Sequence, residues 1–256
     1  MNRFLVLLFI MIASPPAFAR VFSFKDSNLG VMLRGSGGTS SVGKDPYGDS
    51  SGSDTTIVDE TKYNYSGELG LVLGMGSSFN LRIGSEIIQH HPVKEGHGLN
   101  PGGIERFQLE SSTFVFNPNI AAEIFFEAGA TTRFFAQLGL GYAMVDVANR
   151  YTMTATGTSE LGVNDFNEKM SGTGISAMVG AGLETFLLDN VTLSLDAGYR
   201  YIQVSELKYS GDVNNIVRPT GALKGEAALN TDGSKRELNL GGVFVGASLR
   251  FYQHFL

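Results

Sequence analysis

Charged residues recur at alternate positions in those segments of the chain where polar and apolar side chains take turns. Five acids and three arginines share the polar side of these segments. Such a row can close a polar interior, because buried charges persist when they are paired, or it can line a narrow gated pore. We expect the closed interior, and unpaired acids would favour the pore. The eight residues are Glu68, Arg82, Glu86, Glu123, Glu184, Asp196, Arg200 and Arg250.

Two patterns near residue 45 resemble ligand sites but lack a required feature. Residues 38–44 spell most of a phosphate-binding loop, yet Asp45 stands where a Ser or Thr should bind magnesium, and no helix pattern follows. The oxygen-bearing side chains of the same stretch could contact calcium, but they lack EF-hand spacing. We therefore interpret the stretch as a solvated loop. Its oxygen donors are Asp45, Asp49, Ser50, Ser51, Ser53 and Asp54.

Three of the four histidines cluster in one stretch, where His90, His91 and His97 lie near Glu95. Imidazole and carboxylate groups this close can hold zinc or another transition metal. However, adjacent histidines rarely bind one ion together, and the proline and glycine between them indicate a plain turn. We expect no metal and no other cofactor.

Acyl-transfer chemistry at a membrane surface would need a nucleophilic serine with a histidine and an acid. His91 could lie near Ser111 or Ser112, but no His-x-Ser pairing occurs in the chain. We therefore expect a protein that is not an enzyme, and keep a lipid-modifying enzyme as the least favoured alternative.

The elements that position these side chains are strands. Residues 63–75 and 191–202 alternate apolar and polar residues without a break, so each forms a strand with two different faces. A soluble barrel would turn the apolar face inward and expose the charges, over strands of about five or six residues. These strands are longer, so we expect the apolar face to meet lipid and the polar face to line the interior, as in an outer-membrane β-barrel.

Period-two alternation, interrupted by clusters of Gly, Asn, Asp, Ser and Pro, predicts eight strands. The predicted fold is all-β, a transmembrane antiparallel up-and-down barrel with long extracellular loops and short periplasmic turns. The predicted strands are 28–36, 63–75, 79–90, 113–126, 133–147, 173–186, 191–202 and about 237–255.

The connections alternate in length. Long polar loops are expected near 37–60, 91–104, 149–170 and 207–235, and short turns near 76–78, 127–132 and 187–190. Bacterial barrels keep short turns in the periplasm, so both termini are expected there.

Aromatic residues mark both ends of the predicted barrel, as membrane-interface girdles do. Tyrosines are expected at the long-loop ends and phenylalanines at the short-turn ends. They are Tyr63, Tyr65, Tyr142, Tyr199 and Tyr201, and Phe79, Phe126, Phe134 and Phe186.

Pro118 lies within a predicted strand, where it cannot donate to the ladder of backbone hydrogen bonds. A closed barrel has no free edge to accommodate it, so we expect a β-bulge at this position.

The N-terminus has the form of a secretory signal peptide, with Arg3, an apolar run over 4–12, and Ala17-Phe18-Ala19 before Arg20. We expect two parts, a signal peptide at 1–19 and a barrel domain at 20–256. The apolar run is too short for a spanning helix, which needs roughly 20 residues. The chain has no cysteine, so a hydrogen-bonded barrel must supply the stability that disulfides give other secreted proteins. Its net charge of −6 argues against a nucleic-acid partner.

The mature chain resembles the small outer-membrane β-barrels, the group that includes OmpX, OmpW and the OmpA transmembrane domain. The likeness is carried by residues 196–201 (DAGYRY), residues 246–251 (GASLRF), and an alternating C-terminal strand with an aromatic near its end. The resemblance implies that the barrel-assembly machinery reads this last strand. The chain departs from the group in ending with Leu256 after Phe255.

The group includes adhesins, small-solute channels and lipid-modifying enzymes, so the resemblance indicates architecture better than activity. We expect a Gram-negative outer-membrane protein in contact with membrane lipid and lipopolysaccharide. Its surface loops would form a binding, adhesion or structural surface, because loops carry function on rigid scaffolds. The alternative is a narrow porin-like channel or transporter for small solutes.

Overall fold

The computed structural model describes residues 23–24, 28–39, 56–58, 63–129, 131–217 and 220–254. Three expectations fall outside these residues: the signal peptide at 1–19, the loop with calcium-type oxygens that follows Thr39, and the terminal Phe255 and Leu256. In the described part of the chain, no helix has the length and apolar character needed to cross a bilayer.

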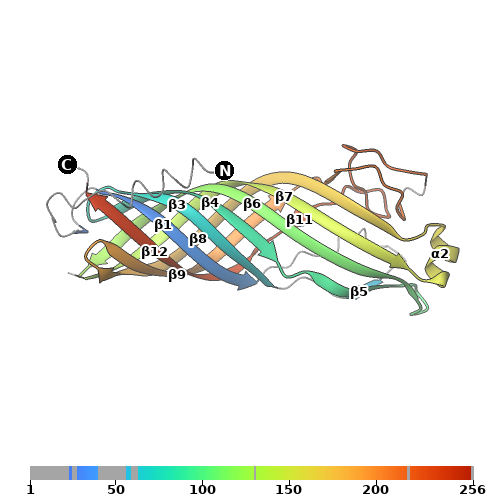
Figure 1. The fold of residues 1–256 in the computed structure, drawn as a ribbon, viewed down its shortest axis with the longest axis horizontal. Coiled ribbons are helices and arrows are strands. Elements are labelled where there is room, and N and C mark those ends of the chain that lie inside the picture. The colour runs from blue at the N-terminus through green and yellow to red at the C-terminus, as the bar shows by residue number, and fades with distance from the viewer. Residues whose placement is uncertain are drawn as a thin grey trace, which may run out of the picture.

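Eight antiparallel strands close a ring in the order β8-β7-β6-β4-β3-β1-β12-β9, and β9 pairs back onto β8 (Figure 1). Each of these strands pairs with the ring strands that come before and after it in the sequence, and the first strand, β1, pairs with the last, β12. The fold is therefore the eight-stranded up-and-down barrel that the sequence predicts. The ring consists of β1 (Asn28–Thr39), β3 (Tyr63–Gly74), β4 (Phe79–His90), β6 (Glu105–Ala128), β7 (Thr132–Met153), β8 (Phe166–Leu188), β9 (Val191–Val204) and β12 (Gly242–His254).

Three neighbouring strands are much longer than predicted. β6, β7 and β8 contain 24, 22 and 23 residues, whereas β1, β3 and β4 contain 12 each. They form a wall that rises above the rest of the barrel at the end opposite the one where β12 finishes (Figure 1). The polar loops expected at 91–104 and 149–170 are therefore largely regular structure.

Short elements complete this tall end. β5 (Val93–Leu99) pairs with β6 and with β2 (Thr56–Val58), while β10 (Lys208–Tyr209) pairs with β8 and β11 (Leu238–Asn239) pairs with β9. A short helix, α2 (Ala155–Leu161), joins β7 to β8.

α2 is fixed at both ends and along its side. The Thr154 hydroxyl accepts a hydrogen bond from the Gly157 amide, and Gly162 ends the helix with a left-handed φ of 71°. A Cβ at Gly157 would overlap the Arg106 carbonyl, so the helix packs directly on β6. The Arg106 Nε to Glu160 Oε2 distance of 2.6 Å adds an ion pair to this contact.

Pro118 does not form the expected bulge. The register between β6 and β7 is the same on both sides of it, with Phe116 opposite Met144 and Asn119 opposite Gly141. The β6–β7 pairing omits only the short stretch that contains the proline, while pairing with β4 continues through it. The irregularity of β6 lies instead near the short turn, between Phe125 and Glu127.

The outer face of the ring carries a continuous apolar belt, as the alternation predicts. Leu138 and Val245 are 63% and 65% exposed, although these side chains are apolar. The same face includes Leu33, Leu69, Leu71, Ile83, Ile87, Ile120, Leu140, Val179, Leu195 and Val243.

The interior is filled in three layers. An apolar cluster of Phe24, Met32, Val72 and Tyr252 lies at the short-turn end. Buried charges occupy the middle. At the tall end, inward apolar residues of the wall pack against residues 205–217 and 220–240, which we call the cap.

Candidate functional site

The middle layer contains ten charged residues that are less than 9% exposed, five acids and five arginines. The sequence-predicted row is among them. Arg34 and Arg133 are the two that sequence reasoning missed, although both lie at the inward phase of the alternation in β1 and β7. Formal charge in this layer is therefore balanced. The ten residues are Arg34, Glu68, Arg82, Glu86, Glu123, Arg133, Glu184, Asp196, Arg200 and Arg250.

Arg34 joins three carboxylates on two sides of the barrel. Its Nε and Nη2 donate to the two carboxylate oxygens of Asp196 at 3.1 and 2.8 Å. Its Nη1 lies 3.6 Å from an oxygen of Glu68 and 3.6 Å from an oxygen of Glu86. Arg200 binds Glu86 from the other side, with 2.6 Å between Nη1 and Oε1.

A second centre forms around Glu123 and Glu184. Arg250 donates to both oxygens of Glu123, at 2.7 and 2.8 Å, and lies 3.4 Å from Glu184. Arg133 reaches the same Glu184 at 2.7 Å. The hydroxyl of Tyr252 completes this centre by donating to Glu184 at 2.8 Å.

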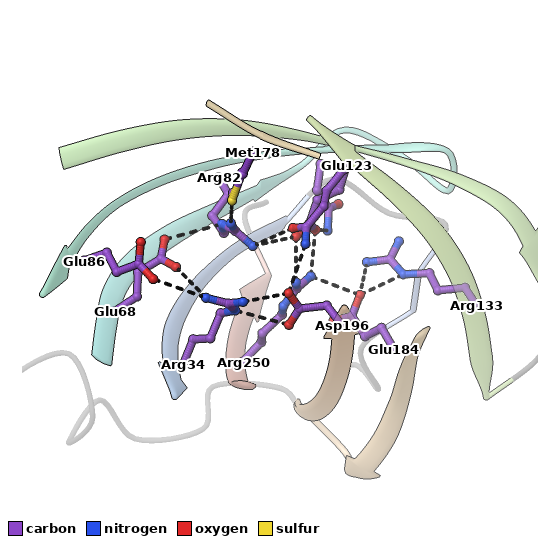
Figure 2. Close-up of polar contacts among 12 residues, drawn as sticks. Arg34, Glu68, Arg82, Glu86, Glu123, Arg133, Met178, Glu184, Asp196 and Arg250 are labelled. Atoms are coloured by element: carbon purple, nitrogen blue, oxygen red, sulfur yellow. Dashed lines mark hydrogen bonds and ion pairs between the residues drawn. The ribbon is translucent and has the colours of Figure 1, made fainter. Parts of the chain in front are cut away.

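Arg82 connects the two centres, as Figure 2 shows. It lies 3.5 Å from Glu68 and 3.3 Å from Glu123. Gln137 adds a second link, because it accepts from Arg82 at 3.1 Å and donates to Asp196 at 2.9 Å. The result is one continuous network of hydrogen bonds and ion pairs, in which each of the five acids lies within 3.6 Å of an arginine.

Aromatic faces support the arginines at the short-turn end of this network. The Arg133 guanidinium lies 3.6 Å from the ring centre of Phe125 and 4.2 Å from that of Phe24. Such contacts stabilise a cation that has lost its water. Below them, the apolar cluster around Phe24 occupies the end of the interior.

The tall end is closed by the cap. Inward side chains of the wall and of β9, including Val115, Val145 and Val204, form an apolar cluster with Leu207 and Leu240 of the cap, and all five are 3% exposed or less. The cap, which contains the long polar loop predicted at 207–235, thus packs inside the barrel mouth through its apolar side chains.

One buried ion pair fixes the cap to the wall. Arg236 of the cap lies 2.5 Å from Glu168 of β8, and Asn215 of the cap donates to the other Glu168 oxygen at 3.1 Å. Tyr151 of β7 donates to Glu168 at 2.9 Å. We call Arg236, Glu168, Asn215 and Tyr151 the latch.

Two residues of the latch, Tyr151 and Arg236, have shifted pKa values. Burial raises the pKa of the Tyr151 hydroxyl well above its usual value, and the neighbouring Glu168 charge raises it further. Burial is the largest influence on the Arg236 pKa and would lower it, but the Glu168 charge and hydrogen bond, together with Tyr151 and Tyr209, outweigh burial and raise it. Both groups therefore keep their protons at neutral pH.

The expected tyrosines occupy the outer face near the tall end. Tyr63, Tyr65, Tyr142, Tyr199 and Tyr201 are between 37% and 63% exposed.

At the short-turn end, Phe126 and Phe134 are exposed, and Phe79 is half-buried. The prediction that Phe186 belongs to the outer aromatic girdle is wrong. Its ring lies 4.4 Å from that of Phe24 and packs on the interior cluster. It shares the inward phase of Glu184, two residues earlier, so it cannot face lipid.

The histidine stretch does not converge. His90 is buried, His91 is exposed, and His97 lies 3.4 Å from Glu105. Among the residues that the structure describes, no group of three His, Cys, Asp or Glu side chains is placed to hold a metal ion. The Ser111 hydroxyl donates to Asn149 at 2.6 Å and not to a histidine.

No protein-family model and no curated protein sequence matches the chain significantly. Solved structures do resemble it. A major outer membrane protein from Thermus thermophilus is 13% identical, with a TM-score of 0.48 over 87% of this chain and 99% of that one. OprG from Pseudomonas aeruginosa is 11% identical, with a TM-score of 0.44 over 90% and 98%. Neisserial surface protein A is 12% identical, with a TM-score of 0.38 over 87% and 96%.

Proposed function

We propose that this chain is a non-conducting outer-membrane barrel of the bacterial envelope, and that its activity lies in binding or adhesion at its extracellular end. The observation that carries the proposal is the filled interior. Two ion pairs, Arg250 with Glu123 and Arg200 with Glu86, each join strands that lie four places apart in the eight-stranded ring. Side chains therefore bridge the full width of the barrel twice.

Placement in a membrane is supported by the apolar belt between tyrosine and phenylalanine residues. A water-soluble protein rarely exposes an apolar surface this continuous, because its contact with water is unfavourable. The short turns then face the periplasm, together with both termini. In this proposal a signal peptide ending at Ala19 directs export, and the assembly machinery recognises the strand that ends near His254.

The rigidity of the extracellular end supports the proposal that this end binds the partner. At the tall end, residues 107–116 of β6 pair without a gap with residues 144–153 of β7, which pair in turn with β8, and the latch holds the cap against this wall. A fixed surface loses little conformational entropy when it binds a partner, which favours affinity. The partner would be a component of the cell exterior, and the lumen would serve only as structural support.

The channel alternative requires that both the network and the cap move aside. Planar-bilayer recordings of the purified protein test it directly, with a known porin as the positive control. We expect no current across the accessible voltage range. A steady, reproducible single-channel current from the wild-type protein would overturn the sealed-barrel proposal.

The binding role needs a separate assay. Cells displaying the wild-type protein should adhere to immobilised matrix or host-cell surfaces more than cells displaying a variant in which residues 155–161 are replaced by a Gly/Ser linker. Retarded or accelerated gel migration without boiling shows that the variant barrel is folded. Equal adhesion of both strains and of cells without the protein would contradict the binding role, and an altered lipid A mass would support an enzyme.

A further inference from the structure

A groove lies on the outer face of the tall wall, outside the barrel and above the apolar belt. It encloses about 470 Å³ and is bordered by Pro92 on one side. Its floor is the small side chain of Ala148, and longer polar side chains of three neighbouring strands surround it. We call this the wall groove.

Strand register places these side chains in two adjacent rows. One row runs Ser112, Ala148, Lys169 across β6, β7 and β8. The next row runs Glu110, Arg150, Asn167 across the same strands. Ala148, in the middle of the first row, has a shorter side chain than Ser112 and Lys169 on either side. The groove therefore follows from the residue types at these positions.

The groove offers mixed chemistry that suits an acidic sugar. Arg150 and Lys169 can bind phosphate or carboxylate oxygens, and the Glu110 carboxylate can accept hydrogen bonds from sugar hydroxyls. Arg150 and Glu110 lie 3.8 Å apart, and their side chains are 67% and 61% exposed, so a ligand can contact both. Lys208 is exposed and pairs with Ser171 on β8 in the row below, where the exposed Asp146 lies opposite Ser171, so that row adds one cation and one acid beside the groove.

The position of the groove indicates where such a sugar would come from. Ala148 lies six residues beyond the exposed Tyr142 on the same outward face, a distance of about 20 Å along the strand. At a strand tilt of about 45°, Ala148 is then roughly 14 Å higher than Tyr142 along the barrel axis. Molecules anchored in the outer leaflet reach this height on the side of the barrel. A soluble partner would instead meet α2 and the cap first.

We infer that the wall groove binds the phosphorylated and carboxylated core sugars of a lipopolysaccharide molecule that sits beside the barrel in the outer leaflet. This inference rests on the proposed outer-membrane placement and adds to it a specific lipid contact. Arg150 and Lys169 hold the acidic groups, Glu110 and Asn167 bind sugar hydroxyls, and the acyl chains lie against the apolar belt below.

The test uses the full-length mature protein in phospholipid nanodiscs, titrated with fluorescent rough lipopolysaccharide that retains its complete phosphorylated core and lacks the O-antigen. The double variant Arg150→Gln/Lys169→Gln should bind it about ten-fold more weakly than the wild type, since two charge-assisted contacts are lost. Lys224→Gln removes an exposed cation from the cap, outside the groove, and should bind as the wild type does. Heat-modifiable gel migration verifies that each variant is folded.

The possible failures are distinguishable. A protein that does not enter nanodiscs contradicts both the membrane placement and the groove. A protein that enters but binds lipopolysaccharide equally well with and without Arg150 and Lys169 contradicts the groove alone. Competition by a free sulfated oligosaccharide at the same concentration as lipopolysaccharide would also overturn the inference, because it would indicate a soluble ligand.

Discussion

Arg250 on β12 and Glu123 on β6 are joined by two hydrogen bonds of 2.7 and 2.8 Å across the interior of the barrel. Whichever way the ring is followed, four strand-to-strand steps separate them. The pair therefore connects opposite walls directly. Backbone pairing joins only neighbouring strands of the ring, so this side-chain pair adds a contact between distant parts of the sequence.

Removing one partner of this pair should destabilise the barrel strongly. Arg250→Met leaves the Glu123 carboxylate buried with fewer cations, which typically costs about 3 to 5 kcal/mol. The double variant Arg250→Met/Glu123→Met should recover part of that loss, because no unpaired charge remains. Urea unfolding in micelles, followed by circular dichroism because the chain has no tryptophan, measures both. Equal stability of the single variant and the wild type would contradict the role assigned to the pair.

The apolar belt makes a separate prediction. Leu71 faces outward at mid-belt and is 43% exposed, so Leu71→Arg should cost about 2 to 4 kcal/mol of folding free energy in a bilayer. Thr152→Arg places the same side chain on the outer face of the tall wall, in water, and should cost little. Refolding yield and urea midpoints in lipid vesicles compare the two. Similar costs for both variants would indicate that Leu71 does not meet lipid.

The ring itself could be predicted from sequence because lipid imposes one simple rule, apolar outward and polar inward. The strands predicted at 79–90 and 191–202 match β4 and β9 closely. Towards the tall end the rule reverses, since the outer face of the wall carries exposed polar side chains and its inner face packs on the cap. Phe107 and Leu109 point inward there, while Glu110 points outward. This pattern is the opposite of the one expected beside lipid, so the predicted strand begins too late in the sequence.

The interior was predictable to the same extent. Arg34 follows the alternation of β1 and could have been found by extending the polar-face count to every strand. The cap could not, because residues 205–240 have no period that places them in the barrel mouth. Its position depends on contacts such as Asn215 with Glu168, which join residues 47 positions apart.

The latch should determine how firmly the cap is held. Glu168→Gln removes the carboxylate that lies 2.5 Å from the buried Arg236, so the cap should open more often and trypsin should cleave sooner after Lys224 and Lys235. Glu206→Gln is the matched control, because it removes the carboxylate that lies 3.0 Å from the exposed Lys235, and ion pairs near the surface contribute little. Limited proteolysis followed by mass spectrometry measures the cleavage rate in both variants. Cleavage at the wild-type rate in Glu168→Gln would show that apolar packing alone holds the cap.

Tyr151 gives the latch a dependence on pH. Its pKa is raised in the folded protein, so its contribution to stability is fully present below the unfolded value of about 10 and is lost as pH rises through the folded value. The resistance of the protein to unfolding by urea in micelles should therefore stay constant from neutral pH to about 10 and decrease above it. Tyr151→Phe should make this alkaline decrease shallower. A loss of resistance that begins near neutral pH would contradict the assignment.

The unequal strand lengths have a practical consequence for display of foreign peptides. From Tyr142 to Met153, β7 rises eleven residues past the tyrosine level, roughly 25 Å above the membrane at the usual tilt. Antibodies and phages approaching an intact cell would reach the β7–β8 hairpin before most of the barrel. An epitope tag inserted between Thr158 and Glu160 should thus be accessible even beneath long surface polysaccharide, whereas one inserted at Gly76 should be hidden from outside.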